Sequence, residues 1–164
     1  MIGDRVTPSG KVSVEIIRAN GNVEHLEGSN AIHQDIRNKL AASLASGTTN
    51  ICCIANPAFD SNAFQTPTNG QSGIYIVLTN GTKYEMLSTK TSTDSNGTAK
   101  TFTVTGVLRS EATYAIASGV LGNVYSTSSG AFTTITSTHA FSGGISLVDG
   151  DQLTVTWTIT IADN

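Results

Sequence analysis

The 164-residue chain has few charged residues, because Asp, Glu, Lys and Arg make up only 13% of it, about half of the usual share of roughly a quarter. A nucleic-acid-binding protein needs clustered basic residues to neutralise phosphates. The nine Lys and Arg residues are instead scattered from Arg5 to Arg109, and the net charge is -3. The same scatter argues against attraction to anionic lipid. We therefore expect neither nucleic acid nor a membrane among the partners.

Cysteine and long apolar runs are also scarce. The only cysteines, Cys52 and Cys53, are adjacent, and neighbouring side chains on a strand point to opposite faces, so an ordinary disulfide between them is not expected. Without a C-x-x-C motif or a second cysteine cluster, we expect no zinc site. Met1–Gly10 is polar and lacks the apolar segment of a cleaved signal peptide. No run is long enough to span a membrane.

The chain is rich in threonine, serine, asparagine and glycine, a composition typical of β-structure with many turns. Its length fits one domain with its own core. We predict an N-terminal arm over residues 1–10 and a single domain over residues 11–164. Asn20-Gly21 and Asn80-Gly81 each predict a hairpin with a type I′ turn.

The clearest strand is Gln152–Ile161, in which apolar residues and threonines alternate. Leu153, Val155, Trp157, Ile159 and Ile161 are predicted to face the core, and Thr154, Thr156, Thr158 and Thr160 the opposite side. We expect Trp157 to lie in the core rather than to form a sugar-binding platform.

One helix is predicted over residues 31–46. Ile32, Ile36, Leu40 and Leu44 recur every four residues, and Ser29 or Asn30 can cap its N-terminus. The apolar run Asn50–Ala55 should form a buried strand, followed by a long loop over Asn56–Ser72. The predicted fold class is therefore mainly β: an antiparallel β-sandwich or barrel of about nine to ten strands with one α-helix.

No arrangement of residues points to catalysis. His25, His33 and His139 lack the spacing of a local metal motif, and no nucleophile elbow or phosphate-binding loop is present. Asp149-Gly150-Asp151 reads as a hairpin turn, with a calcium site as the weaker alternative. We predict a protein that is not an enzyme and that uses no metal and no cofactor.

Several features predict contacts with other molecules. Threonine-rich strand faces are polar but uncharged, and such faces do little to block association between strands. The predicted arm and the long loop could add contacts with neighbouring subunits, although Phe59 and Phe64 could instead fold back onto the core. The candidate interface residues are Arg5, Pro8, Phe59, Phe64, Pro67, Thr154, Thr156 and Thr158.

The chain opens with S-N-A-I-H-Q-D-I-R-N-K-L-A-A-S-L after its first hairpin and closes with G-D-Q-L-T-V-T-W-T-I-T-I, which is the more specific of the two segments. In this layout it resembles small virion structural proteins of tailed bacteriophages. The resemblance implies a β-sandwich subunit of a tail, baseplate or fibre-attachment region, with head decoration as a close variant. It also implies assembly in the host cytoplasm, with copies of the chain and other virion proteins as partners.

Two other functions stay open. A carbohydrate- or receptor-binding module, which could recognise a host-surface glycan, would need exposed aromatic side chains. The candidates are Tyr75, Tyr84, Tyr114 and Tyr125, with Phe59 and Phe64. A hydrolase with carboxylates far apart in the sequence is the remaining alternative.

Overall fold

The computed structural model describes residues 6–32, 72–93, 99–126 and 131–163, which form nine strands and no helix. The strands are β1 (Val6–Ile17), β2 (Val23–Ile32), β3 (Ser72–Leu78), β4 (Lys83–Glu85), β5 (Leu87–Thr93), β6 (Ala99–Arg109), β7 (Tyr114–Ser126), β8 (Ala131–Leu147) and β9 (Gln152–Asp163). This confirms the mainly β fold class and agrees with the predicted number of strands.

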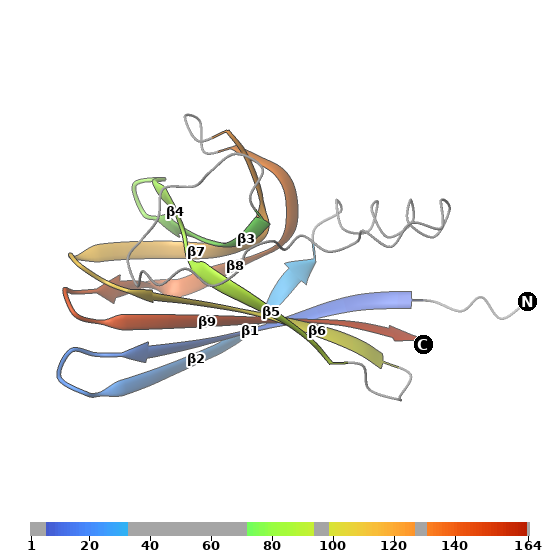
Figure 1. The fold of residues 1–164 in the computed structure, drawn as a ribbon, viewed down its shortest axis with the longest axis horizontal. Coiled ribbons are helices and arrows are strands. Elements are labelled where there is room, and N and C mark those ends of the chain that lie inside the picture. The colour runs from blue at the N-terminus through green and yellow to red at the C-terminus, as the bar shows by residue number, and fades with distance from the viewer. Residues whose placement is uncertain (1–5, 33–71, 94–98, 127–130, 164) are drawn as a thin grey trace, which may run out of the picture.

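The strands form two antiparallel sheets. Sheet A has the order β2-β1-β9-β6-β5, and sheet B has the order β4-β3-β7-β8, with the end of β2 beside β8. Figure 1 shows the long strands of sheet A running side by side, with β3 and β4 above them. The arrangement is compatible with the predicted sandwich, and it is not a closed barrel.

Besides the β6–β7 and β8–β9 connections, the described chain crosses between the two sheets at two further places. Residues 23–30 of β2 pair with β1, whereas Ala31 and Ile32 pair with β8. The second crossing is at Met86, between β4 in sheet B and β5 in sheet A, where the buried Met86 donates its N–H to the carbonyl of Ile74 at 2.9 Å. Strands that change sheet in this way form the corners of a two-sheet domain.

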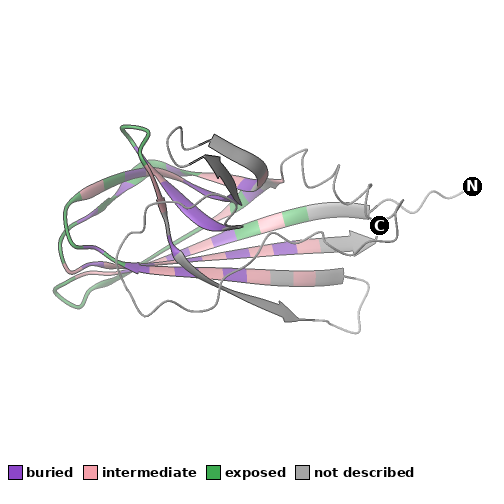
Figure 2. Ribbon diagram, turned by 45° about the horizontal axis from the view of Figure 1, so that its top comes forward, coloured by how far each residue is buried: buried purple, intermediate pink, exposed green. Residues whose placement is uncertain are grey.

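The core lies between the two sheets. Its residues are those that occur at every second position along the strands and so point to the inner side. Leu153, Val155 and Trp157 are fully buried on β9 while the threonines between them are half-buried, so the predicted alternation and the core position of Trp157 are both confirmed. Figure 2 shows the same alternation of buried and half-buried residues along the described parts of β1, β6 and β9. A glycine at position 119 leaves room for the indole, since a Cβ there would lie 3.0 Å from the Trp157 ring.

Both Asn-Gly sequences form hairpin turns, but the predicted type I′ geometry is wrong. Gly21 and Gly81 have φ values of 88° and 86°, whereas no non-glycine residue of the described chain has a positive φ. A type I′ turn would need a positive φ at Asn20 as well. Arg18 N–H donates to the Asn22 carbonyl and Gly21 N–H donates to the Arg18 carbonyl, both at 2.8 Å. These bonds define a three-residue loop in which the glycine takes the left-handed position.

Two predicted boundaries are also wrong. The predicted helix cannot begin at Ala31, because Ala31 and Ile32 are the last residues of β2; residues 33–46 lie outside the described residues. The predicted arm is too long, because Val6–Gly10 belong to β1 and pair with β9. The Asn50–Ala55 strand and the loop that follows it, up to residue 71, also fall outside the description.

Within the described part of the chain, no helix has the length and apolar character needed to cross a membrane.

Candidate subunit interface

The outer face of sheet A carries an array of threonines on its two central strands. Antiparallel register places Thr103 beside Thr158 and Thr105 beside Thr156. On β1, Lys11 lies beside Thr158 and Ser13 beside Thr156. The array consists of Thr101, Thr103, Thr105, Thr154, Thr156, Thr158 and Thr160, all half-buried. We call this set the threonine face.

Threonine hydroxyls in this array bond to one another across the strands. The Oγ1 atoms of Thr105 and Thr156 lie 3.3 Å apart, and those of Thr103 and Thr158 lie 3.5 Å apart. Threonine hydroxyls carry no charge, and each can donate once and accept twice. The threonine face is thus an ordered, uncharged surface, on which a partner would have no buried charge to compensate.

Charged residues lie at one border of this face, on β1 and β2. Lys11 Nζ is 2.8 Å from a Glu27 carboxylate oxygen, and His25 Nδ1 is 3.8 Å from a Glu15 carboxylate oxygen. These side chains are exposed or half-buried, so the pairs contribute little to stability. The outer face of sheet A thus has a charged area on β1 and β2 and a neutral area over the threonines of β6 and β9, with Arg109 at the end of β6.

The structure brings together only part of the predicted interface. Thr154, Thr156 and Thr158 share the threonine face. Pro8, expected in a free arm, pairs through its backbone register with Ile161 of β9. Arg5, Phe59, Phe64 and Pro67 lie outside the described residues.

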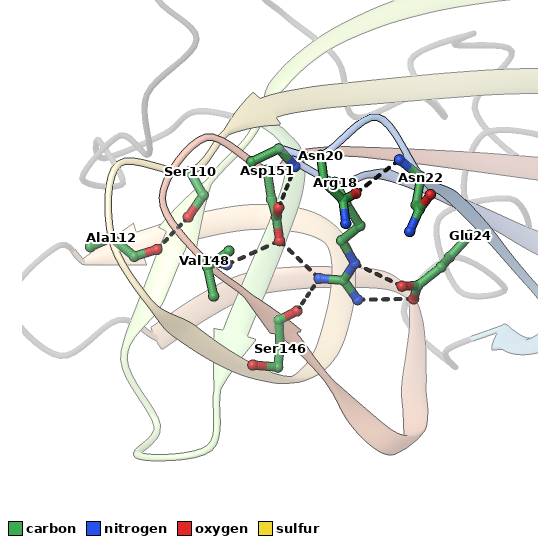
Figure 3. A network of polar contacts seen from close by, with 10 residues as sticks. Arg18, Asn20, Asn22, Glu24, Ser110, Ala112, Ser146, Val148 and Asp151 are labelled. Carbon is green, nitrogen blue, oxygen red and sulfur yellow. Dashed lines mark hydrogen bonds and ion pairs between the residues drawn. The ribbon is translucent and has the colours of Figure 1, made fainter.

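A second polar cluster, centred on Asp151, joins the turns at one end of the sandwich. The carboxylate accepts hydrogen bonds from Ala19 N–H at 2.9 Å and Val148 N–H at 3.0 Å, in addition to one from Arg18 at 2.8 Å. Ser110 N–H donates to the Asp151 carbonyl at 2.7 Å, and Gly150 N–H donates to the Ser110 carbonyl at 2.9 Å. The β1–β2, β6–β7 and β8–β9 connections are therefore held together, as Figure 3 shows.

Arg18 extends this cluster to β2 and β8. Its guanidinium donates to both carboxylate oxygens of Glu24, at 2.8 and 2.9 Å, and to the Ser146 carbonyl at 2.6 Å. In Figure 3 the guanidinium lies between Asp151 and Glu24. A bidentate arginine–carboxylate pair has a defined geometry as well as a favourable energy. The side chain thus connects the ends of three strands.

These contacts alter the ionisation of the cluster. Burial raises the pKa of Asp151, but the hydrogen bonds from Val148, Ala19 and Arg18 outweigh burial, and the pKa lies below its usual value. The hydrogen bond from Arg18 lowers the pKa of Glu24. The bonds to Glu24 and Asp151 raise the pKa of Arg18. All three groups are charged at neutral pH.

The cluster does not have the chemistry of a calcium site. Both oxygens of the Asp151 carboxylate already accept from N–H groups, whereas calcium requires oxygens with lone pairs directed at the cation. An open depression of about 370 Å³ lies beside Arg18, Glu24 and Asp151, and its charges pair with one another. Within the described residues, no three His, Cys, Asp or Glu side chains are grouped as a metal site would require.

Of the aromatic side chains proposed for glycan binding, the three that the structure describes do not form an exposed platform. Tyr75 is fully buried. Tyr84 and Tyr114 pack against the core and meet edge to face, with ring centroids 5.8 Å apart. The description does not extend to the side chain of Tyr125 or to Phe59 and Phe64.

Comparison with protein-family models, with curated proteins and with solved structures returned no significant match.

Proposed function

We propose that the chain is a non-enzymatic structural subunit of a tailed-phage virion. Its place would be the tail, baseplate or fibre-attachment region, with head decoration as a close variant. In this role a β-sandwich acts as a rigid body that associates with its own copies and with other virion proteins. The resemblance of the closing strand to phage virion proteins supports the proposal that the particle is a tailed-phage virion.

The threonine face is the observation that carries the structural role. Its hydroxyls lie within hydrogen-bonding reach across the strands, at 3.5 Å between Thr103 and Thr158 and 3.3 Å between Thr105 and Thr156. Little side-chain entropy remains to be lost when a partner covers such β-branched residues. The Asp151 cluster also suits a rigid subunit, because it joins three connections at one end of the domain.

The alternative of a carbohydrate- or receptor-binding module has less support. Sugar recognition commonly uses exposed aromatic rings, and the packing of Tyr75, Tyr84 and Tyr114 directs these rings toward the protein. A glycan array that shows specific binding would favour this alternative over the structural role.

The proposal is tested by the native mass of the full chain, together with negative-stain imaging. We expect a defined oligomer or ring at micromolar concentration. In Thr156→Lys, a charge is placed at the centre of the threonine face, and assembly should weaken by about tenfold or more while the melting temperature changes little. Glu111→Lys, in an exposed connection, makes a charge change outside this face and should assemble normally.

A wild-type chain that stays monomeric at all accessible concentrations would contradict the proposal. Equal assembly of Thr156→Lys and wild type would remove the threonine face from the interface.

A further inference from the structure

Strand β2 is paired along only one edge for most of its length. From Val23 to Asn30 it pairs with β1, and its other edge meets β8 only at Ala31 and Ile32. No other described strand pairs with the second edge of residues 23–29. In Figure 1, β2 is the outermost strand at the lower margin of the drawing. An unpaired strand edge offers backbone donors and acceptors to another chain.

The hydrogen bonds show which residues present backbone groups at this edge. In an antiparallel pair, alternate residues direct both of their backbone groups to the same neighbour. The Asn22 carbonyl accepts from Arg18 on the β1 side, whereas the Ser29 carbonyl accepts from His139 Nδ1, 3.0 Å away on β8. Val23, His25 and Glu27 therefore direct their N–H and C=O groups away from β1, as does Ser29.

The side chains at this edge include an exposed apolar residue. Leu26 lies opposite Val14 in the β1–β2 register and so points to the inner side of sheet A. Val14 is buried, but Leu26 is 43% exposed. Sheet B does not cover the inner side of β2 at this position. A partner strand beside β2 would cover Leu26.

We propose that the free edge of β2 pairs antiparallel with the same edge of a second copy, about a two-fold axis at Leu26. His25 then lies opposite Glu27 of the second copy, and the two residues exchange both backbone hydrogen bonds. Leu26 meets its own counterpart on the inner side, and Val23 lies opposite Ser29. The two copies of sheet A become one continuous ten-stranded sheet, from the five strands that each copy contributes.

Charge complementarity selects this register over its neighbours. Only registers that join outward-directed residues can form the backbone bonds. Moving the axis to Glu27 places two glutamates directly opposite each other, which is unfavourable. Moving it to His25 places two histidines opposite each other and Leu26 opposite the Glu24 carboxylate. An axis at Leu26 instead matches an acidic residue with a basic one, and an apolar residue with an apolar one.

This inference rests on the proposed function in one respect, which is that the chain associates with its own copies. It adds the surface, the partner and the register. The threonine face remains open on both copies in this arrangement, because the new contact runs along the edge of sheet A.

The register is tested by disulfide trapping in the full chain with Cys52→Ser and Cys53→Ser. In Leu26→Cys, the two thiols would lie in a non-hydrogen-bonded pair, with Cα atoms about 4.5 Å apart, within the range for a disulfide. We expect Leu26→Cys to form a cross-linked dimer under mild oxidation at least about tenfold faster than Val23→Cys. Val23 is the matched control, since it is similarly exposed on the same strand but lies far from its own counterpart in this register.

The backbone contact is tested separately with His25→Pro, followed by sedimentation equilibrium. Proline removes one outward N–H without breaking a bond to β1, and proline is tolerated on edge strands. Each dimer loses two hydrogen bonds, so the dissociation constant should rise about tenfold or more. Circular dichroism and the melting temperature verify that the variant folds.

These experiments distinguish the pairing through β2 from the proposed structural role. Equal cross-linking of the two cysteine variants, or an unchanged dissociation constant in folded His25→Pro, overturns pairing through β2 even if the chain assembles by another surface. A wild-type chain that stays monomeric overturns both this pairing and the proposed structural role.

Discussion

Strands β9 and β2 both flank β1 in sheet A, but their surroundings differ. β9 is paired along both edges, with β1 and with β6, and its inner residues Leu153, Val155 and Trp157 are buried. Among the described strands, β2 is paired along one edge for most of its length, and its inner residue Leu26 is 43% exposed. At Leu26, the inner side of sheet A is thus exposed on β2, whereas the inner residues of β9 on the other side of β1 belong to the core.

Because of this difference, substitutions on β9 and on β2 should affect different properties of the protein, namely its stability and its association. Burial on β9 makes its inner residues determine whether the domain folds. The open edge of β2 and its exposed residues from Val23 to Glu27 add little to folding, so their substitution should change how copies associate. The predictions that follow test this separation, from the largest expected effect to the smallest.

The same substitution on the two strands should have different effects. Leu153→Ala removes a fully buried side chain and should lower the free energy of unfolding by about 3 kcal/mol. Leu26→Ala removes a partly exposed side chain and should cost less than about 1 kcal/mol. Urea denaturation followed by circular dichroism measures both values at a concentration where the chain is monomeric. Equal losses would show that the inner side of β2 is as well packed as that of β9.

Asp151 joins the turn before β9 to the β1–β2 hairpin, so its loss should affect both strands. Asp151→Asn weakens charge-assisted hydrogen bonds from Arg18, Ala19 and Val148 and should cost about 2 kcal/mol at pH 7. Asp149→Asn, an exposed neighbour in the same turn, is the matched control and should change stability little.

The pH dependence of this loss has a definite sign. Because the pKa of Asp151 lies below its usual value in the folded protein, the charged carboxylate stabilises the fold above about pH 4, the usual unfolded value. That contribution is lost as the pH falls further, through the folded pKa. The difference between wild type and Asp151→Asn should therefore shrink on acidification. A difference that stays constant from pH 7 to pH 2 would exclude the charge of Asp151 as its cause.

The smallest effect is expected on the outer side of β9. Thr156→Val keeps the β-branched shape but removes the hydroxyl that lies 3.3 Å from the Thr105 hydroxyl. Unfolding free energy should change by less than about 1 kcal/mol, since strand propensity is retained and a single partly exposed hydrogen bond is lost. Assembly, measured by native mass, should change more than stability does. A decrease of several kcal/mol in the free energy of unfolding would show that the threonine face stabilises the fold rather than an assembly.

Local patterns predicted much of sheet A. The alternation in Gln152–Ile161 identified both sides of β9, and Asn20-Gly21 located the first hairpin. The helix start was wrong because Ala31 and Ile32 fit a helical period equally well, and only their pairing with β8 makes them a strand. The arm was too long because Pro8 and Gly10 are turn-forming residues locally, whereas their strand conformation depends on pairing with distant β9.

The polar contacts between distant segments could not be predicted. Asp151 and Arg18 lie 133 residues apart in the sequence, so neither position alone indicates an ion pair, and the local sequence predicts only a turn at Asp151. The free edge of β2 could not be predicted for the same reason. Whether a strand is paired on one side or two depends on which distant strand reaches it, and β8 reaches β2 only at its last two residues.

The central claim is that the outward backbone groups of His25 and Glu27 are unpaired among the described residues of one chain and pair with a second copy. Amide hydrogen exchange, resolved by residue with NMR at low and high protein concentration, tests this most directly. At low concentration the N–H groups of Glu24 and Leu26, which face β1, should be protected, and those of His25 and Glu27 should exchange rapidly. At high concentration His25 and Glu27 should become protected too. Protection of these two amides at both concentrations, or at neither, would contradict the claim.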